Sequence, residues 1–139
     1  MSSLRQRVLA WLPAGLVGLV LFIASSVPGT SYPQVNVRFA DKMVHLAFYS
    51  VLGAACARGM LRSTVWRGPR LVLAATAIAT AFGATDELHQ LFVPFRSADW
   101  HDLVADAVGA FVGSLLWALL HRRVWPRSTT TEARGPEGL

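Results

Sequence analysis

Four apolar stretches alternate with polar ones along the chain, and each has the composition of a helix that lies in lipid. They run over residues 8–26, 43–57, 71–85 and 103–120. A bilayer core about 30 Å thick needs about 20 helical residues to cross it, so the second and third stretches are too short without their polar flanks. We therefore predict four membrane-spanning helices that draw polar residues into the membrane at their ends.

The composition supports a membrane protein. Of the 139 residues 53% are hydrophobic and only 15% are charged, which is too apolar for a soluble domain of this size. We predict one all-α domain, an integral membrane four-helix bundle over residues 1–124, followed by a disordered cytoplasmic tail over residues 125–139. The single cysteine, Cys56, lies in an apolar run, and we interpret it as a packed thiol.

Charge is distributed unevenly between the connecting segments. Ten of the thirteen basic residues precede the first stretch, separate the second from the third, or follow the fourth, whereas six of the eight acids lie on the other side. By the positive-inside rule we predict that both termini are cytoplasmic and that the acids face outward. The basic residues then serve as membrane anchors, so we expect the lipid bilayer as a partner and no nucleic acid.

The segment after the third apolar stretch is the richest in candidate chemistry. Residues 71–85 carry no charge, and then Asp86, Glu87, Gln90 and Arg96 follow within eleven positions. On a continuing helix, residues three and four apart are neighbours, so Asp86 and Glu87 both lie beside Gln90. We predict a polar patch at the end of an apolar helix.

The second helix carries a similar group at its start. Asp41 and His45 lie four residues apart and so share one face of a helix, with Lys42 beside Asp41. His45 lies inside the apolar run, where an ionisable side chain is costly unless it faces the bundle interior with a partner. We predict that Asp41 orients His45.

The last helix repeats this arrangement. Asp102 and Asp106 share a face, and Gly109 and Gly113 continue it as a Gly-x-x-x-Gly pattern that lets another helix approach closely. Counted at 1.5 Å per residue from the basic ends of their helices, Asp86 and Asp106 both lie about 24 Å up. The ionisable residues of three helices should therefore meet at one level, as a polar site near the outer face.

Metal and cofactor signals are absent from this sequence. The histidines show no His-Glu-x-x-His or similar spacing, and there is no nucleotide-binding loop or cofactor fingerprint. We interpret His89 and His101 as interfacial side chains and Asp99 as a helix N-cap. We accordingly predict no metal site and no cofactor. Neighbouring buried carboxylates would also suit a bound cation, and the sequence leaves open whether the acidic cluster binds one.

Three ordered motifs resemble a known family. They are Asp41-Lys42-x-x-His45-x-x-x-Tyr49, Asp86-Glu87-x-x-Gln90-x-x-x-Pro94-x-Arg96 and Asp102-x-x-x-Asp106-x-x-Gly109-x-x-x-Gly113. In this order the chain is similar, from Ser25 to Leu120, to the VanZ-like family of small bacterial integral membrane proteins, the teicoplanin-resistance protein family. It departs from the usual pattern at Asp106, where the family has Asn, and at Phe95, where it has Gly. The resemblance implies an inner-membrane protein of the cell envelope and a link to glycopeptide antibiotic resistance.

Binding is the first of three functions that the residues leave open. The outward-facing site would hold the headgroup of an envelope lipid or cell-wall precursor. Lys42 and Arg96 would hold its anionic part, and the carboxylates and amide would form hydrogen bonds with it. The binding residues we expect are Lys42, Gln90, Arg96, Asp102 and Asp106.

Catalysis and helix packing are the two alternatives. A membrane-embedded acid–base enzyme acting on an envelope lipid or cell-wall precursor would use Glu87 or Asp86 as general base, with His45 as acid or base. Asp41 would orient that histidine, and Arg96 would stabilise developing charge. Alternatively, the charged residues only neutralise one another so that the helices pack. The sequence leaves the oligomeric state open.

Overall fold

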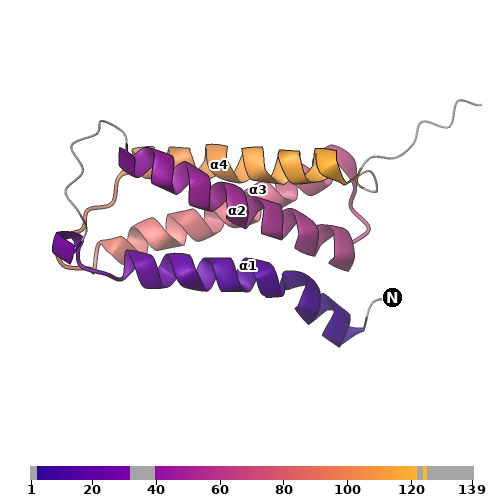
Figure 1. The fold of residues 1–139 in the computed structure, drawn as a ribbon, viewed down its shortest axis with the longest axis horizontal. Coiled ribbons are helices and arrows are strands. Elements are labelled where there is room, and N and C mark those ends of the chain that lie inside the picture. The colour runs from indigo at the N-terminus through magenta and orange to yellow at the C-terminus, as the bar shows by residue number, and fades with distance from the viewer. Residues whose placement is uncertain (1–2, 32–39, 122–123, 125–139) are drawn as a thin grey trace, which may run out of the picture.

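Four long helices make up the part of the chain that the structure, a computed structural model, describes, namely residues 3–31, 40–121 and 124. Figure 1 shows α1 (Leu4–Ser25), α2 (Ala40–Ser63), α3 (Gly68–Gln90), α4 (Trp100–Leu120) and a short 3-10 turn, η1 (Gly29–Ser31). The described residues contain no strand, which confirms the all-α class. The predicted tail, residues 125–139, and much of the first connecting loop, residues 32–39, lie outside the described residues.

Each of the four helices is long and apolar enough to cross a membrane, as predicted. The polar flanks do extend the second and third apolar stretches, because α2 begins at Ala40 and α3 continues to Gln90. Large apolar side chains lie on the outside of the bundle, whereas the interior contains many small ones. Fully buried alanines include Ala57, Ala75, Ala79, Ala110 and Ala118. This arrangement suits a bundle that is surrounded by lipid.

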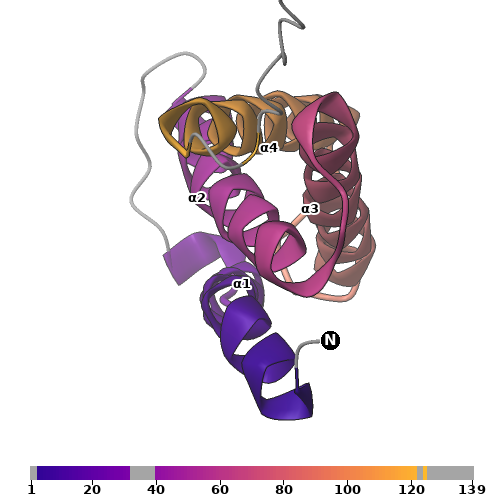
Figure 2. The same ribbon diagram turned by 90° about the vertical axis from the view of Figure 1, so that its right-hand side faces the viewer.

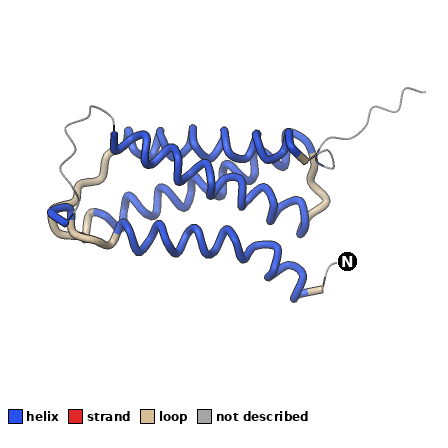
Figure 3. Tube along the Cα trace, in the orientation of Figure 1, coloured by secondary structure: helices blue, strands red, loops and turns tan. Residues whose placement is uncertain are grey.

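The helices run along a common long axis, as the tube in Figure 3 shows. Viewed from the end in Figure 2, α2, α3 and α4 form the main group and α1 lies along one side of it. α4 packs most extensively on α2, and α1 packs mainly on α2. The N-terminal part of α1 bends away from the bundle in Figure 1, and Pro13 inside this helix accounts for a bend.

Glycines bring α2 and α4 into backbone contact. A Cβ atom at Gly109 would collide with the carbonyl oxygen of Leu46, and one at Gly113 with that of Ser50. On the other helix, Gly53 lies equally close to the backbone of α4. The close approach predicted from the Gly-x-x-x-Gly pattern is therefore present, and α2 is the helix that approaches.

The two ends of the bundle differ in character. The end formed by the C-termini of α1 and α3 and the N-termini of α2 and α4, at the left of Figure 1, contains all the acids of the described residues. We call it the acidic end. The prediction that polar groups of several helices meet at one level is confirmed there. Its position on the outer side of the membrane stays a prediction from the distribution of charge.

The connection from α3 to α4 contains an unusual backbone conformation. Phe95 has a φ of 60°, in the left-handed region that only glycine adopts without strain, and its side chain is exposed. The turn begins with Val93, whose carbonyl oxygen accepts a hydrogen bond of 3.2 Å from the backbone N–H of Arg96. The glycine that the sequence resemblance implies at this position would fit the conformation that the structure shows.

Replacing Phe95 with glycine is expected to stabilise the protein. The left-handed conformation costs a non-glycine residue about 1–2 kcal/mol, and the greater freedom of glycine in the unfolded chain offsets about 0.4–1 kcal/mol of the gain. A net increase of up to about 1.6 kcal/mol should appear in thermal unfolding of the purified protein in detergent. Phe92→Gly is the control, because Phe92 is also exposed but has a negative φ. Equal stability changes for both variants would contradict the explanation.

Candidate functional site

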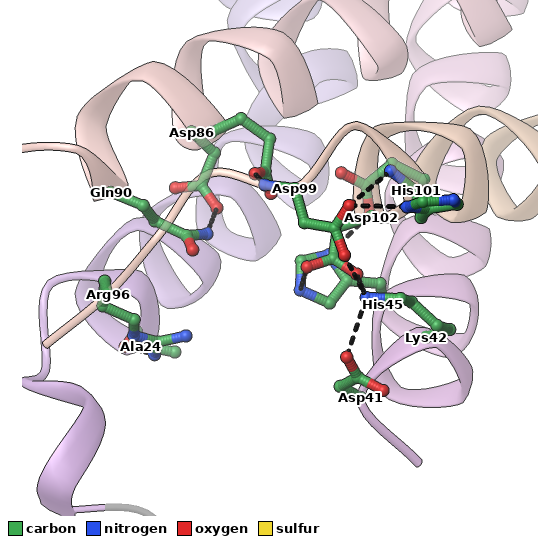
Figure 4. A network of polar contacts seen from close by, with 12 residues as sticks. Ala24, Asp41, Lys42, His45, Asp86, Gln90, Arg96, Asp99, His101 and Asp102 are labelled. Atoms are coloured by element: carbon green, nitrogen blue, oxygen red, sulfur yellow. Dashed lines mark hydrogen bonds and ion pairs between the residues drawn. The ribbon is translucent and has the colours of Figure 1, made fainter. Parts of the chain in front are cut away.

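Polar side chains from all four helices gather at the acidic end, although they lie within helices of membrane-spanning length. Figure 4 shows this network from close by. Its buried polar members are Ser25 of α1, Asp86, Glu87 and Gln90 of α3, and Asp102 and Asp106 of α4. Five of these six residues were predicted as site residues from the sequence. The contacts divide the network into three parts, which differ in how many of their polar atoms have a hydrogen-bond or ion-pair partner.

Lys42 is the centre of the first part, which we call the lysine cluster (Lys42, Asp41, Asp99 and Asp102). Its ammonium nitrogen Nζ lies 2.8, 2.7 and 2.6 Å from carboxylate oxygens of Asp41, Asp99 and Asp102, respectively. Asp99 also accepts a hydrogen bond of 2.9 Å from the backbone N–H of His101, which confirms it as the N-cap of α4. The hydrogen bond from Lys42, together with those from His101, holds the pKa of Asp99 well below its usual range.

Asp86 is the centre of the second part, which joins α1 to α3. The Ser25 hydroxyl donates to Asp86 Oδ1 at 2.5 Å, and the Gln90 amide donates to Asp86 Oδ2 at 3.3 Å. Both carboxylate oxygens are therefore satisfied by neutral donors. Ser25 was not predicted as a site residue, because a serine at the end of an apolar helix has no distinctive spacing. Its contact makes Asp86 part of the helix packing.

The third part, which we call the histidine cluster, consists of His45, Tyr49, Glu87 and Asp106. His45 Nδ1 lies 2.8 Å from Asp106 Oδ1, within hydrogen-bond distance. Glu87 Oε2 accepts a hydrogen bond of 2.9 Å from the backbone N–H of Asp99. Three atoms of this cluster are buried without a hydrogen-bond partner in the described parts of the chain: Glu87 Oε1, Asp106 Oδ2 and the Tyr49 hydroxyl.

The prediction that Asp41 orients His45 is wrong. Asp41 pairs with Lys42 and its side chain is 61% exposed, whereas His45 pairs with Asp106 of the neighbouring helix. Helical side chains point toward the N-terminus of their own helix, so a carboxylate in the first turn of α2 extends out of the helix end. The orienting carboxylate for His45 comes from α4.

Three residues of the histidine cluster have the arrangement of metal ligands. His45, Glu87 and Asp106 each offer one ligand atom, and these atoms all lie within 4.8 Å of one another. They come from three different helices. The prediction of no metal site rested on the missing spacing within one helix, and that spacing carries no information about ligands that only the packing of helices brings together.

Arg96 lies apart from the two carboxylate clusters, beside Ala24 at the end of α1 (Figure 4). Its guanidinium donates to the backbone oxygens of Val27 at 3.3 Å and Ala24 at 3.4 Å. A cation at a helix C-terminus stabilises the carbonyl groups that have no partner within the helix. Arg96 therefore connects the loop after α3 to the end of α1.

Comparison with known proteins gives one result. The family model described as VanZ/LLP1 matches residues 9–121, which include most of α1 and the whole of the other three helices. The comparisons with curated proteins and with solved structures found no match. The family match covers most of the chain and includes each part of the polar network. This multi-pass membrane protein belongs to the VanZ/LLP1 family.

Proposed function

We propose that the protein binds the polar headgroup of a cell-envelope lipid or lipid-linked cell-wall precursor at its acidic end, on the outer side of the membrane. The observation that carries this proposal is the pair of buried, unpartnered carboxylate oxygens, Glu87 Oε1 and Asp106 Oδ2. Leaving a buried polar group without a partner costs about 1–3 kcal/mol, and more if it is charged. A cluster that only packed helices would be expected to satisfy them, as it does Asp86.

A groove in the apolar part of the bundle supports a lipid as the ligand. It has a volume of about 360 Å³, and residues of α1, α2 and α3 line it, including Trp11, Gly18, Phe22, Leu52 and Phe82. The ring of Phe22 lies 4.6 Å from that of His89, beside the acidic end. An acyl chain in this groove would place its headgroup next to the polar network.

Lys42 and Arg96, the two cations of the site, have different roles in this proposal. Lys42 is already surrounded by three carboxylates, so Arg96 is the cation that we propose for the anionic part of the headgroup. The hydroxyl or ammonium groups of the headgroup would donate to Glu87 and Asp106. A link to glycopeptide resistance would follow if that headgroup belonged to a cell-wall precursor.

Lipids that co-purify with the protein test the proposal. Mass spectrometry of equal amounts of folded wild type and Arg96→Gln should find one lipid class enriched on the wild type and reduced about tenfold on the variant. A charge-assisted hydrogen bond contributes about 1.5–3 kcal/mol, which corresponds to at least this change. Arg62→Gln, which removes an exposed guanidinium at the opposite end, should retain the wild-type profile. Identical profiles on wild type and Arg96→Gln would refute headgroup binding.

Acid–base catalysis is a second candidate, and the contact of 2.8 Å between His45 and Asp106 favours it. A carboxylate that accepts a hydrogen bond from one ring nitrogen orients the ring and stabilises its protonated form, which suits a general base. Asp106 would take the orienting role, and Glu87 would be the second acid or base. The lipid class identified on the wild type is then the substrate whose conversion by the purified protein is to be measured.

A further inference from the structure

We propose that His45, Glu87 and Asp106 bind a divalent transition-metal ion of the Zn²⁺ or Mn²⁺ type between α2, α3 and α4. Bonds to such ions are about 2.0–2.2 Å long, so neighbouring ligand atoms lie about 3.0–3.5 Å apart. The separation of 2.8 Å between His45 Nδ1 and Asp106 Oδ1 is close to this value. All three residues offer ligand atoms that lie within 4.8 Å of one another, so small side-chain movements would bring them to these distances.

The unpartnered atoms provide an independent sign of a ligand. Glu87 and Asp106 are more than nine-tenths buried, and each has one oxygen without a partner in the described ranges. Asp106 Oδ2 faces Gly83 of α3, where an added Cβ atom would lie 2.8 Å from this oxygen and 3.1 Å from the Tyr49 ring. Glycine at this position thus lets the Asp106 carboxylate lie directly against the backbone of α3. A metal ion, or a water molecule bound to it, would satisfy these atoms in place of the headgroup donors proposed above.

Charge favours a cation at the same place. Glu87 and Asp106 carry two formal negative charges in helices of membrane-spanning length, where unneutralised charge is costly. Within the described residues, no lysine or arginine forms an ion pair with either of them, because Lys42 contacts the acids of the lysine cluster. An ion of charge +2 would neutralise both carboxylates.

The donor set decides the class of ion. One imidazole nitrogen and two carboxylate oxygens suit Zn²⁺ and Mn²⁺, whereas Mg²⁺ and Ca²⁺ prefer oxygen ligands alone and Cu⁺ prefers sulfur. Three protein ligands also leave coordination positions for water or for an oxygen of a bound molecule. Metal binding does not require the headgroup proposed above, so it can be tested with the metal alone.

Metal binding should be measured on the purified full chain, with any affinity tag removed and after treatment with a chelator. We expect titration with Zn²⁺ or Mn²⁺ to show one equivalent bound and a rise in the unfolding temperature. His45→Gln and Asp106→Asn, which preserve side-chain size, should each weaken binding at least about tenfold. His101→Gln is the matched control, because its exposed histidine contacts Asp99 outside the proposed ligand set, and it should bind like wild type.

Two results would overturn the proposal. One is a wild-type protein that binds neither Zn²⁺ nor Mn²⁺, or that binds Mg²⁺ or Ca²⁺ more tightly. The other is an equal loss of affinity in His45→Gln, Asp106→Asn and His101→Gln. If either ligand variant does not fold, Glu87→Gln takes its place with the same expected loss, and size-exclusion chromatography checks that each protein is folded. The lipid profile of the wild type is a separate measurement, so either proposal can fail without the other.

Discussion

Gly113→Ala is expected to destabilise the bundle by about 3 kcal/mol, near the upper end of what overpacking costs. A Cβ atom at this position would collide with the backbone of Ser50, including its carbonyl oxygen. A flexible side chain could move aside, but here the whole of α2 must move away from α4. Because α2 and α4 carry His45 and Asp106, the same movement should weaken their contact.

Thermal unfolding in detergent, followed by the fraction of protein that stays monodisperse, measures this effect. Gly15→Ala is the matched control, since no atom lies within 4 Å of the Cβ position at Gly15. That variant should be unchanged or more stable by about 0.5–1 kcal/mol, because alanine favours a helix more than glycine does. A Gly113→Ala protein as stable as Gly15→Ala would show that the two helices are not held in backbone contact.

Helix geometry explains why the level of the site could be predicted from sequence. The rise per residue is fixed, so the distance of Asp86 and Asp106 from the basic ends of their helices follows from counting. Their burial follows as well, because a carboxylate inside an apolar run must face the protein interior. The structure places both with His45 at the acidic end, as these arguments require.

The partners of each side chain could not be predicted in the same way. Counting along one helix suggested Asp41 as the partner of His45, but the relative rotation of α2 and α4 gives that role to Asp106. The position of Arg96 against the end of α1 depends on how a turn folds back, and spacing does not encode this. Which residues could hold a cation could not be predicted for the same reason, since they come from three helices.

Lys42→Met is expected to destabilise the protein by about 2–3 kcal/mol. The Lys42 ammonium contacts three carboxylates at 2.6 to 2.8 Å, and methionine keeps most of the side-chain length without the charge. Removing one partner of a buried ion pair costs about 3–5 kcal/mol, because the other charge is left uncompensated. The Lys42 side chain is 22% exposed, so we expect solvent to reduce this loss. The same unfolding assay in detergent measures it.

Asp102 should account for most of this loss, because its side chain is only 12% exposed whereas that of Asp41 is 61% exposed. Asp41→Asn alone should change stability by less than about 0.5 kcal/mol, as expected for an exposed ion pair. Adding Asp102→Asn to Lys42→Met should restore part of the lost stability, since the uncompensated charge is then removed. If the double variant is no more stable than Lys42→Met, then lost packing of the lysine stem, rather than the unpaired carboxylate, causes the destabilisation.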